Sequence, residues 1–168
     1  STFVHSGITG LIDIVYNKGV GTVIVLDNSI TGMTGHQNNP LNGLDIKNNP
    51  AKQIDLVMLA KSIGIERVRI IDPFDVEEAM AVIKEEINAI EPSLIISLRP
   101  CALLKTVRYK GCVTVDRDKC TKCKMCMSLG CPAISFKNNQ IEIDTSLCNG
   151  CGLCVNVCKF GALKKEEK

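Results

Sequence analysis

The chain has 168 residues, of which 45% are apolar and 23% charged, and its net charge is +2. This composition is typical of a globular protein and excludes a disordered or fibrous chain. The charge is too small to indicate nucleic acid or a membrane surface as a partner, and no apolar stretch reaches the ~20 residues of a membrane span.

The first part of the chain, residues 1–106, alternates between helical and strand-like patterns. Apolar residues at helical spacing predict helices at 8–16, 54–63 and 76–90. Gly64 is expected to end the second of these. Continuous apolar runs predict strands at 22–26, 68–71 and 94–98. The first strand is expected to be buried on both faces. Because strands and helices alternate, this part is predicted to be an α/β domain with a parallel sheet.

A long polar stretch, rich in Asn and Gly, lies between Leu26 and Ala51. It begins at the C-terminal end of a predicted strand, where open α/β sheets bind ligands. Loops of this length inside compact domains are commonly functional. A surface insertion without a role is the alternative.

All ten cysteines lie after residue 100, and no secretory segment is visible. A disulfide framework would staple the whole of a small secreted chain, so metal binding in the cytoplasm is the favoured interpretation. Eight of the cysteines form a duplicated pattern of three closely spaced residues followed by a more distant one. The first half holds Cys120, Cys123, Cys126 and Cys131, and the second holds Cys148, Cys151, Cys154 and Cys158.

The spacing indicates two [4Fe–4S] clusters. A loop with a cysteine at every third position reaches three corners of a four-iron cube, and the fourth thiolate must come from elsewhere. In two-cluster ferredoxins it comes from the other half of the repeat. We therefore assign Cys120, Cys123, Cys126 and Cys158 to one cluster, and Cys131, Cys148, Cys151 and Cys154 to the other. Zinc is the main alternative, but its Cys₄ sites use paired cysteines and would leave the third of each group unused. Disulfides are the remaining alternative.

The sequence also gives expectations for four further residues near the cysteine pattern. Gly150 and Gly152 are expected to let the backbone approach the second cluster. Cys101 and Cys112, outside the duplication, are expected to be small buried hydrophobic residues.

Residues 112–163 resemble the bacterial-type two-cluster ferredoxin family. Two departures are visible: four residues, not three, separate Cys126 from Cys131, and Lys159 replaces a common proline. We place a small α+β ferredoxin-like domain at 107–168.

The segment from Val23 to Gln37 resembles the second half of the thiamine diphosphate motif of 2-oxoacid:ferredoxin oxidoreductases. Residues 1–8 resemble the segment that comes after the Gly-Asp pair of that motif, and the pair itself is expected just before residue 1. The order of the two domains, and Arg99-Pro100-Cys101 before the linker, narrow the resemblance to the α subunits of indolepyruvate:ferredoxin oxidoreductases. Residues 1–106 would then be the C-terminal part of an incomplete thiamine diphosphate-binding domain.

The resemblance implies a set of cofactor contacts. Asn28 would offer its side-chain oxygen, and Ile30 its carbonyl, to the Mg²⁺ that accompanies the diphosphate. Ser29, Thr31 and Thr34 would donate hydrogen bonds to phosphate oxygens, and Met33 would line the thiazolium pocket. Read without the resemblance, Asp27-Asn28 is an ordinary turn at the end of a strand.

The implied activity is oxidative decarboxylation of an aryl pyruvate to acyl-CoA and CO₂, in the cytoplasm. Electrons would leave through the two clusters to a separate ferredoxin, coenzyme A would be the co-substrate, and a β subunit would complete the enzyme. The 168 residues alone are expected to bind clusters without turning over. The alternatives are a different 2-oxoacid, such as pyruvate or 2-oxoglutarate, and a non-catalytic electron-transfer subunit.

Overall fold

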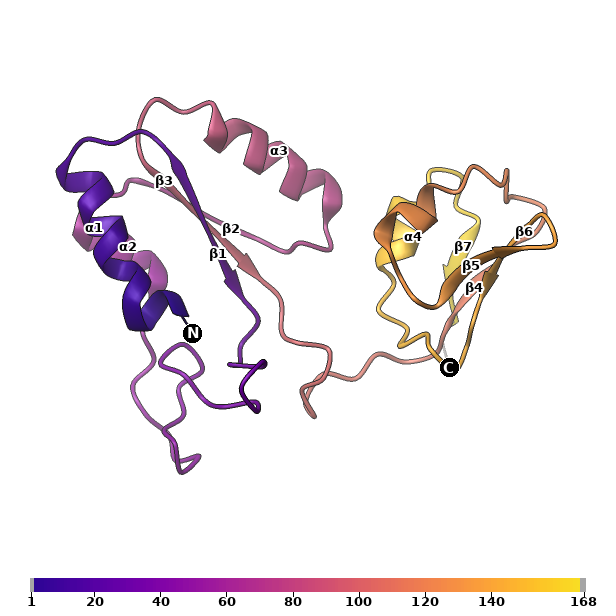
Figure 1. Cartoon of the computed structure of the whole chain (residues 1–168), viewed down its shortest axis with the longest axis horizontal. Coiled ribbons are helices and arrows are strands. Elements are labelled where there is room, and N and C mark those ends of the chain that lie inside the picture. Colours follow the sequence, from indigo (N-terminus) through magenta and orange to yellow (C-terminus); the bar gives the residue numbers. More distant parts are fainter. Residues whose placement is uncertain (1, 167–168) are drawn as a thin grey trace. The chain divides into compact units, whose positions relative to one another are not determined.

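The computed structural model describes residues 2–166, which divide into two compact units, Ser1–Val107 and Arg108–Lys168 (Figure 1). The boundary proposed from the sequence, after residue 106, lies one residue from this division. The architecture predicted from the sequence, a parallel-sheet α/β domain followed by a small α+β domain, is confirmed. No helix in the described part of the chain is long and apolar enough to cross a membrane.

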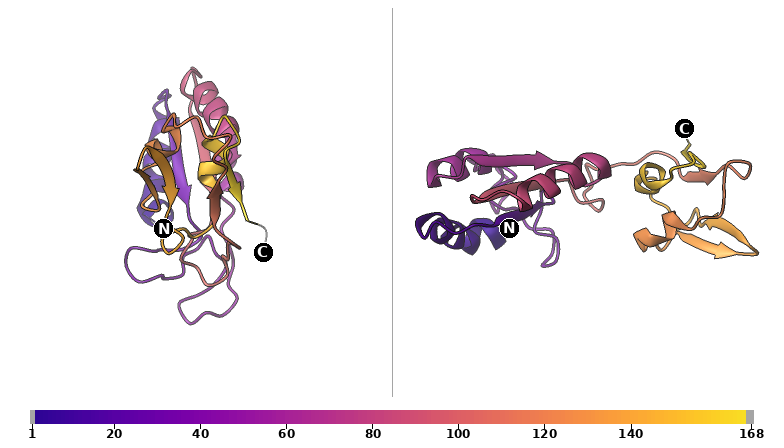
Figure 2. Two further views of the ribbon diagram at one scale, coloured as in Figure 1. Left: turned by 90° about the vertical axis from the view of Figure 1, so that its right-hand side faces the viewer. Right: turned by 90° about the horizontal axis from the view of Figure 1, so that it is seen from above.

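The N-terminal unit is built on a parallel sheet with the strand order β1–β3–β2. Alternate residues of the sheet face different helices: Leu94 and Ile96 pack with α1 and α2, whereas Ile95 packs with α3. The helices therefore cover both faces, and the left view of Figure 2 shows α1 and α3 on opposite sides of the strands. The elements are η1 (Phe3–Gly7), α1 (Ile8–Tyr16), β1 (Thr22–Asp27), α2 (Leu56–Ile63), β2 (Arg67–Ile71), α3 (Val76–Ile87) and β3 (Ser93–Leu98).

Local signals explain where α2 and α3 begin and end. The Asp55 carboxylate accepts hydrogen bonds from the N–H groups of the first turn of α2, and the Asp75 carboxylate accepts one from the Glu78 N–H. Gly64 ends α2 in the left-handed conformation, with a φ of 106°, as predicted from the sequence.

The prediction that the first strand is buried on both faces was wrong for the described residues. Only Val25 of β1 is buried, whereas Ile24 and Leu26 are 43% and 76% exposed. The reason is topological, because β1 pairs on one side with β3 and β3 occupies the centre. The strand that is buried as expected for a parallel sheet is β3, where Leu94 and Ile95 are fully buried.

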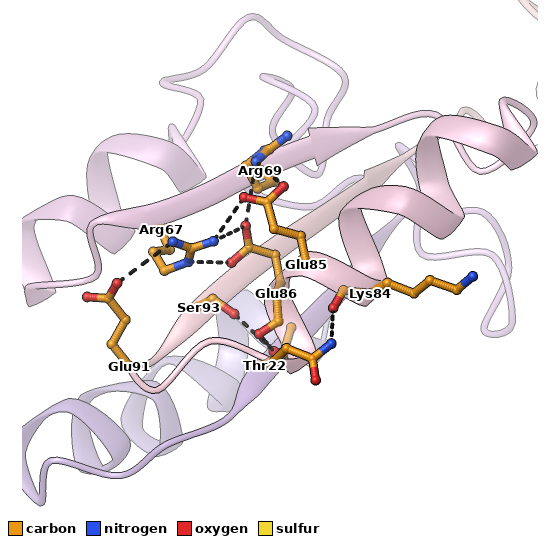
Figure 3. A network of polar contacts seen from close by, with 9 residues as sticks. Thr22, Arg67, Arg69, Lys84, Glu85, Glu86, Glu91 and Ser93 are labelled. Atoms are coloured by element: carbon orange, nitrogen blue, oxygen red, sulfur yellow. Dashed lines mark hydrogen bonds and ion pairs between the residues drawn. The ribbon is translucent and has the colours of Figure 1, made fainter.

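An ion-pair network ties α3 to the start of β2 (Figure 3). The Glu86 carboxylate is 1% exposed and accepts hydrogen bonds from Arg67 Nε at 2.8 Å and Nη2 at 3.1 Å. Its hydrogen bond to Glu86 raises the pKa of Arg67, against the opposing effect of desolvation. The Glu86 carbonyl accepts from the Thr22 hydroxyl, which in turn accepts from the Ser93 hydroxyl. These contacts fix the edge of the sheet opposite to the strand ends that carry the long polar loop.

The C-terminal unit contains two small antiparallel sheets. Strand β4 pairs with β7, so the two ends of the unit meet, and β5 pairs with β6 as a hairpin. Short helices between the sheets carry cysteines of both halves of the duplicated pattern. The elements are β4 (Val113–Val115), η2 (Met125–Leu129), β5 (Ile134–Lys137), β6 (Gln140–Ile143), α4 (Leu153–Val157) and β7 (Leu163–Lys165).

Candidate functional site

The eight cysteines of the duplicated pattern lie around two separate cavities of the C-terminal unit. The first cavity is lined by the cysteines 120, 123, 126 and 158, and the second by the cysteines 131, 148, 151 and 154. Each cavity thus takes three cysteines from one half of the pattern and the distant cysteine from the other half. This grouping is the one that the sequence assigns to the two clusters.

The backbone holds each group of three cysteines in the same way. Asp116 accepts a hydrogen bond from the Cys120 N–H through its carbonyl, and Asp144 accepts one from the Cys148 N–H. The Asp116 carboxylate also accepts a hydrogen bond from the Asp118 N–H, and the Asp144 carboxylate accepts one from the Ser146 N–H. Sequence reasoning did not identify this pair of aspartates. Both aspartates precede the first cysteine of their group by the same number of residues, and this shared spacing is the sequence signal that identifies them.

The extra residue before Cys131 is absorbed by local structure. Residues 125–129 form a single turn of 3₁₀ helix, η2, and Gly130 follows in the left-handed conformation with a φ of 64°. This turn places Cys126 in the interior and returns the chain to Cys131 at the second cavity.

The thiols perturb one another within each group. Burial, and after it the neighbouring cysteines 151, 131 and 148, together raise the pKa of Cys154 to about 11. Burial also raises the pKa of Cys126, with added contributions from the cysteines 158, 123 and 120. The cysteines that raise the pKa of Cys126 and of Cys154 line the same cavity as the affected thiol and come from both halves of the duplicated pattern.

Cys158 differs from the other thiols because backbone N–H groups surround it. Burial acts to raise its pKa, but the N–H groups of the four residues from Phe160 to Leu163 outweigh burial and lower it. Ala162 N lies 3.3 Å from Cys158 Sγ, and Val113 N lies 3.5 Å from Cys148 Sγ. Such N–H···S contacts stabilise negative charge on a sulfur ligand.

Both cavities fit an iron–sulfur cluster by the chemistry of their donors. Each presents four thiols against apolar side chains, among them Ile134 at the second cavity and Ile141 at the first. Among residues 2–166, no three His, Cys, Asp or Glu side chains converge on one point as ligands of a single metal ion do. The first cavity is the smaller, about 20 Å³ against about 190 Å³, so the two are not equivalent in this conformation.

The two glycines of the second group have different surroundings. A side chain at Gly150, which has a φ of 72°, would overlap the Gly111 carbonyl oxygen. Gly150 therefore permits a close approach between two backbone segments. Gly152, with a φ of 82°, lines the second cavity and has no other group near the position of a Cβ. The prediction that Cys101 and Cys112 are buried was wrong, since both are only half-buried; Cys101 lies in the segment after β3, and Cys112 lies directly before β4.

The candidate thiamine diphosphate residues follow β1 at the carboxyl edge of the parallel sheet. The Asp27 carboxylate accepts the Ser29 N–H at 2.8 Å, and Asn28 Oδ1 accepts the Ile30 N–H at 3.3 Å. Ser29 has a φ of 60°, in the left-handed region. The turn expected from Asp27-Asn28 alone is thus present, and it places oxygen donors of the predicted contacts on one short segment.

The rest of this loop is folded by its own polar side chains. Thr31 pairs with Gln37 through two backbone hydrogen bonds, and Thr34 Oγ1 donates to Gln37 Oε1 at 2.7 Å. Asn39 is buried and donates to Thr31 Oγ1 at 3.4 Å. Ile30 is buried, whereas Met33 is fully exposed. The hard oxygen donors fit a Mg²⁺-diphosphate, and the role of Met33 stays a prediction.

Sequence reasoning named Arg99 only as part of the Arg-Pro-Cys segment and did not find its contacts at this edge of the sheet. Arg99 follows β3, donates to the Asp72 carboxylate after β2, and lies 3.6 Å from the centre of the Phe74 ring. Arg99 N and Cys101 N donate to the carbonyls of Asp27 and Asn28. The Arg-Pro-Cys segment thus fixes the turn that begins the loop.

Comparisons with known proteins agree with this division. Residues 1–97 match the family described as thiamine pyrophosphate enzyme, C-terminal TPP binding domain, and residues 117–134 and 141–164 match 4Fe-4S binding domains. The chain is 36% identical to the indolepyruvate oxidoreductase subunit IorA of Pyrococcus horikoshii, with all of this chain and 27% of the relative covered. The IorA proteins of Pyrococcus abyssi and Archaeoglobus fulgidus are 35% and 36% identical, with 100% and 99% of this chain covered.

These relatives are much longer than the chain, which covers 27% of the length of the first two and 28% of the third. The resemblance inferred from the sequence is confirmed over the whole chain. The family match extends over more than half of the residues and includes β1, β2 and all but the last residue of β3. The chain therefore belongs to the thiamine pyrophosphate enzymes, as a C-terminal TPP-binding domain joined to 4Fe-4S binding domains.

Proposed function

We propose that this chain is part of a thiamine diphosphate-dependent 2-oxoacid:ferredoxin oxidoreductase that oxidatively decarboxylates aryl pyruvates, with indolepyruvate as the representative substrate. One observation carries the proposal: a TPP-binding domain is joined in one chain to two cavities that each gather four thiols from both halves of a duplication. The names of the relatives, which are indolepyruvate oxidoreductase subunits, support indolepyruvate as the 2-oxoacid substrate.

The eight cysteines are the proposed ligands of two [4Fe–4S] clusters, four at each cavity. A cluster of this kind, when bound, accepts and releases a single electron. The chain supplies the thiolates, N–H donors to Cys148 and Cys158, and apolar side chains that exclude water. Exclusion of water and N–H donation are the means by which a protein tunes the potential of such a group.

The segment 28–34 is the proposed diphosphate site. Asn28 Oδ1 and the Ile30 carbonyl are the proposed Mg²⁺ ligands, since Mg²⁺ takes hard oxygen donors. The hydroxyls of Ser29, Thr31 and Thr34 are the proposed donors to phosphate oxygens, and the Met33 side chain is proposed to contact the thiazolium ring. Thiamine diphosphate, when bound, supplies the electron sink that decarboxylation requires.

The other components of the reaction are proposed from the same family. Coenzyme A would accept the acyl group, a β subunit would complete the enzyme, and an external ferredoxin in the cytoplasm would accept the electrons. Because the chain spans about a quarter of its relatives, we expect the 168 residues alone to bind clusters but not to decarboxylate a 2-oxoacid.

The test is a substrate panel on the full-length complex under anaerobic conditions. Ferredoxin reduction is measured with indolepyruvate, phenylpyruvate, pyruvate and 2-oxoglutarate, each with coenzyme A and thiamine diphosphate. We expect the aryl pyruvates to give the highest kcat/KM. A preference for pyruvate or 2-oxoglutarate would contradict the substrate assignment. Failure of the intact complex to bind thiamine diphosphate would contradict the enzyme assignment and favour an electron-transfer subunit.

A matched pair of variants tests the cofactor segment in that complex. Asn28→Ala is expected to weaken thiamine diphosphate binding about tenfold, because it removes a metal ligand. Asn88→Ala, at the end of α3 and at the opposite edge of the sheet, is the control and should leave binding unchanged. Equal binding by the two variants would exclude Asn28 as a ligand.

A further inference from the structure

The two halves of the ferredoxin-like unit present different surfaces although they share one cysteine pattern. Around the first group the chain carries Lys119, Lys122 and Lys124, and Lys159 follows the distant cysteine of the same cavity. At the corresponding positions around the second group stand Leu147, Gly150 and Gly152, and no Lys or Arg occurs between residues 138 and 158. The positive charge therefore gathers at one of the two cavities.

Two of the lysines have a backbone conformation that favours glycine. Lys122 and Lys124 have φ values of 59° and 61°, in the left-handed region that favours glycine. Their counterparts Gly150 and Gly152 have φ values of 72° and 82°. The same turn is therefore built with glycine in one half and with lysine in the other, where a side chain is strained. Folding alone favours glycine at both positions, so the lysines indicate a requirement for positive charge.

Lys119, Lys122 and Lys159 each stand next in sequence to a residue that lines the first cavity. Cys123 is exposed, and Lys119, Lys122 and Lys159 are exposed and have no carboxylate partner among residues 2–166. Lys124 lines the cavity with its ammonium 4.0 Å from the centre of the Phe136 ring. Asp118 is the one acidic residue between 117 and 126.

Apolar side chains line the same cavity. Met125 and Phe160 both line it and are 44% and 49% exposed. Apolar side chains together with a polar rim are the usual composition of a protein–protein contact surface. The surface at the first cavity therefore suits contact with a protein, and the exposed Cys123, a proposed cluster ligand, lines that cavity.

We propose that this surface, formed by Lys119, Lys122, Lys124, Met125, Lys159 and Phe160, is the docking site of a small acidic one-electron carrier protein. The proposal rests on the function proposed above. The proposal also assigns a direction of electron transfer within the unit. Electrons leave from the cluster at Cys120, Cys123, Cys126 and Cys158, and one electron passes from it to the docked carrier. The charge of the whole unit supports an acidic partner, since residues 108–168 contain eleven Lys and Arg against six Asp and Glu, whereas residues 1–107 contain nine against twelve.

The test measures binding of an acidic flavodoxin, used as the probe, to the anaerobically prepared, cluster-loaded chain by titration calorimetry. Lys122→Gly/Lys124→Gly removes two charges and gives the first half the glycines of the second, so the fold is not put at risk. Lys18→Gly/Lys61→Gln is the matched control, because Lys18 also has a positive φ (54°) and both lysines are exposed in the other unit.

We expect the first variant to raise the Kd about tenfold at about 0.02 M salt, and the control to change it less than about twofold. The difference should vanish at about 0.5 M salt, where charges at the surface are screened. Equal weakening by both variants, or no weakening by either, would overturn the docking site. Iron analysis and EPR of the same samples separate the two proposals: protein without clusters contradicts the proposed function, and clusters with unchanged binding contradict the docking site alone.

Discussion

The thiol of Cys158 lies beside the thiol of Cys126, although the two come from opposite halves of the duplicated cysteine pattern. The pairing of β4 with β7 explains this arrangement, because it returns the end of the unit to its beginning. Asp116 N donates to the Ala162 carbonyl at 2.7 Å, which continues the contact up to the first group of cysteines. Each cavity is thus complete only when both halves are folded.

Gly150 is one of two positions in the described part of the ferredoxin-like unit, together with Gly111, where an added methyl group would overlap a backbone oxygen. In Gly150→Ala, the added Cβ would overlap the Gly111 carbonyl oxygen in a residue that has a positive φ. We expect a loss of about 2 kcal/mol or more of unfolding free energy. The matched control is Gly130→Ala, which has a positive φ but open space and should cost about 1 kcal/mol. Denaturant unfolding under anaerobic conditions measures both, and equal losses would contradict the steric argument.

Glu86 should be the most important acidic residue for the stability of the N-terminal unit. Glu86→Gln removes the buried charge that faces Arg67 and Arg69, so we expect the melting temperature to fall by about 5 °C or more. Glu85→Gln is the control, because Glu85 contacts the same arginines but is 53% exposed and should matter little. A larger effect of the control would show that burial does not set the contribution of these carboxylates.

Asp45 should make the polar loop sensitive to acid. The Asn49 N–H, first, and then the Asn49 side chain and the Lys47 N–H lower the pKa of Asp45, against a smaller effect of burial. A carboxylate with a lowered pKa stabilises the folded turn above its unfolded pKa, about 3.9, and the stabilisation is lost as the pH falls through the folded pKa.

Hydrogen exchange of a peptide that covers the 45–49 turn measures this effect, with rates corrected for the intrinsic pH dependence. We expect Asp45→Asn to reduce protection at about pH 6 and to differ less from the unsubstituted chain at about pH 3. The peptide that covers α2 serves as the internal control and should not change. A difference that persists unchanged at the lower pH would show that the charge of Asp45 is not the cause.

The sequence predicted the elements of the parallel sheet well, because their signals are local. Gly64 marks a helix end by backbone chemistry that needs no distant partner, and it was found where the pattern places it. Exposure of Ile24 and Leu26 was not predictable in this way, since it depends on which strand lies at the centre of the sheet. Strand order is a property of the whole chain and leaves no mark on a single apolar run.

The candidate site shows the same division between local and distant information. Spacing shows that three thiolates on a short loop cannot close a four-iron cube, and the ligand exchange of two-cluster ferredoxins then groups the cysteines. The Arg99–Asp72 contact, in contrast, joins the ends of two strands and carries no motif. The contact of Gly150 with the backbone of residues 110–111 likewise depends on tertiary packing, so glycine at that position was read as serving the cluster.

The most direct test of the exchanged-ligand arrangement compares two double variants of the cysteines. Cys126→Ser/Cys158→Ser removes two ligands from the first cavity, so the chain should retain one cluster, about four iron atoms. Cys126→Ser/Cys131→Ser removes one ligand from each cavity, so both clusters should be lost or severely depleted. Iron and sulfide analysis of the anaerobically purified proteins gives the counts. If the second variant keeps one full cluster while the first loses both, each half binds its own cluster and the exchanged-ligand arrangement is wrong.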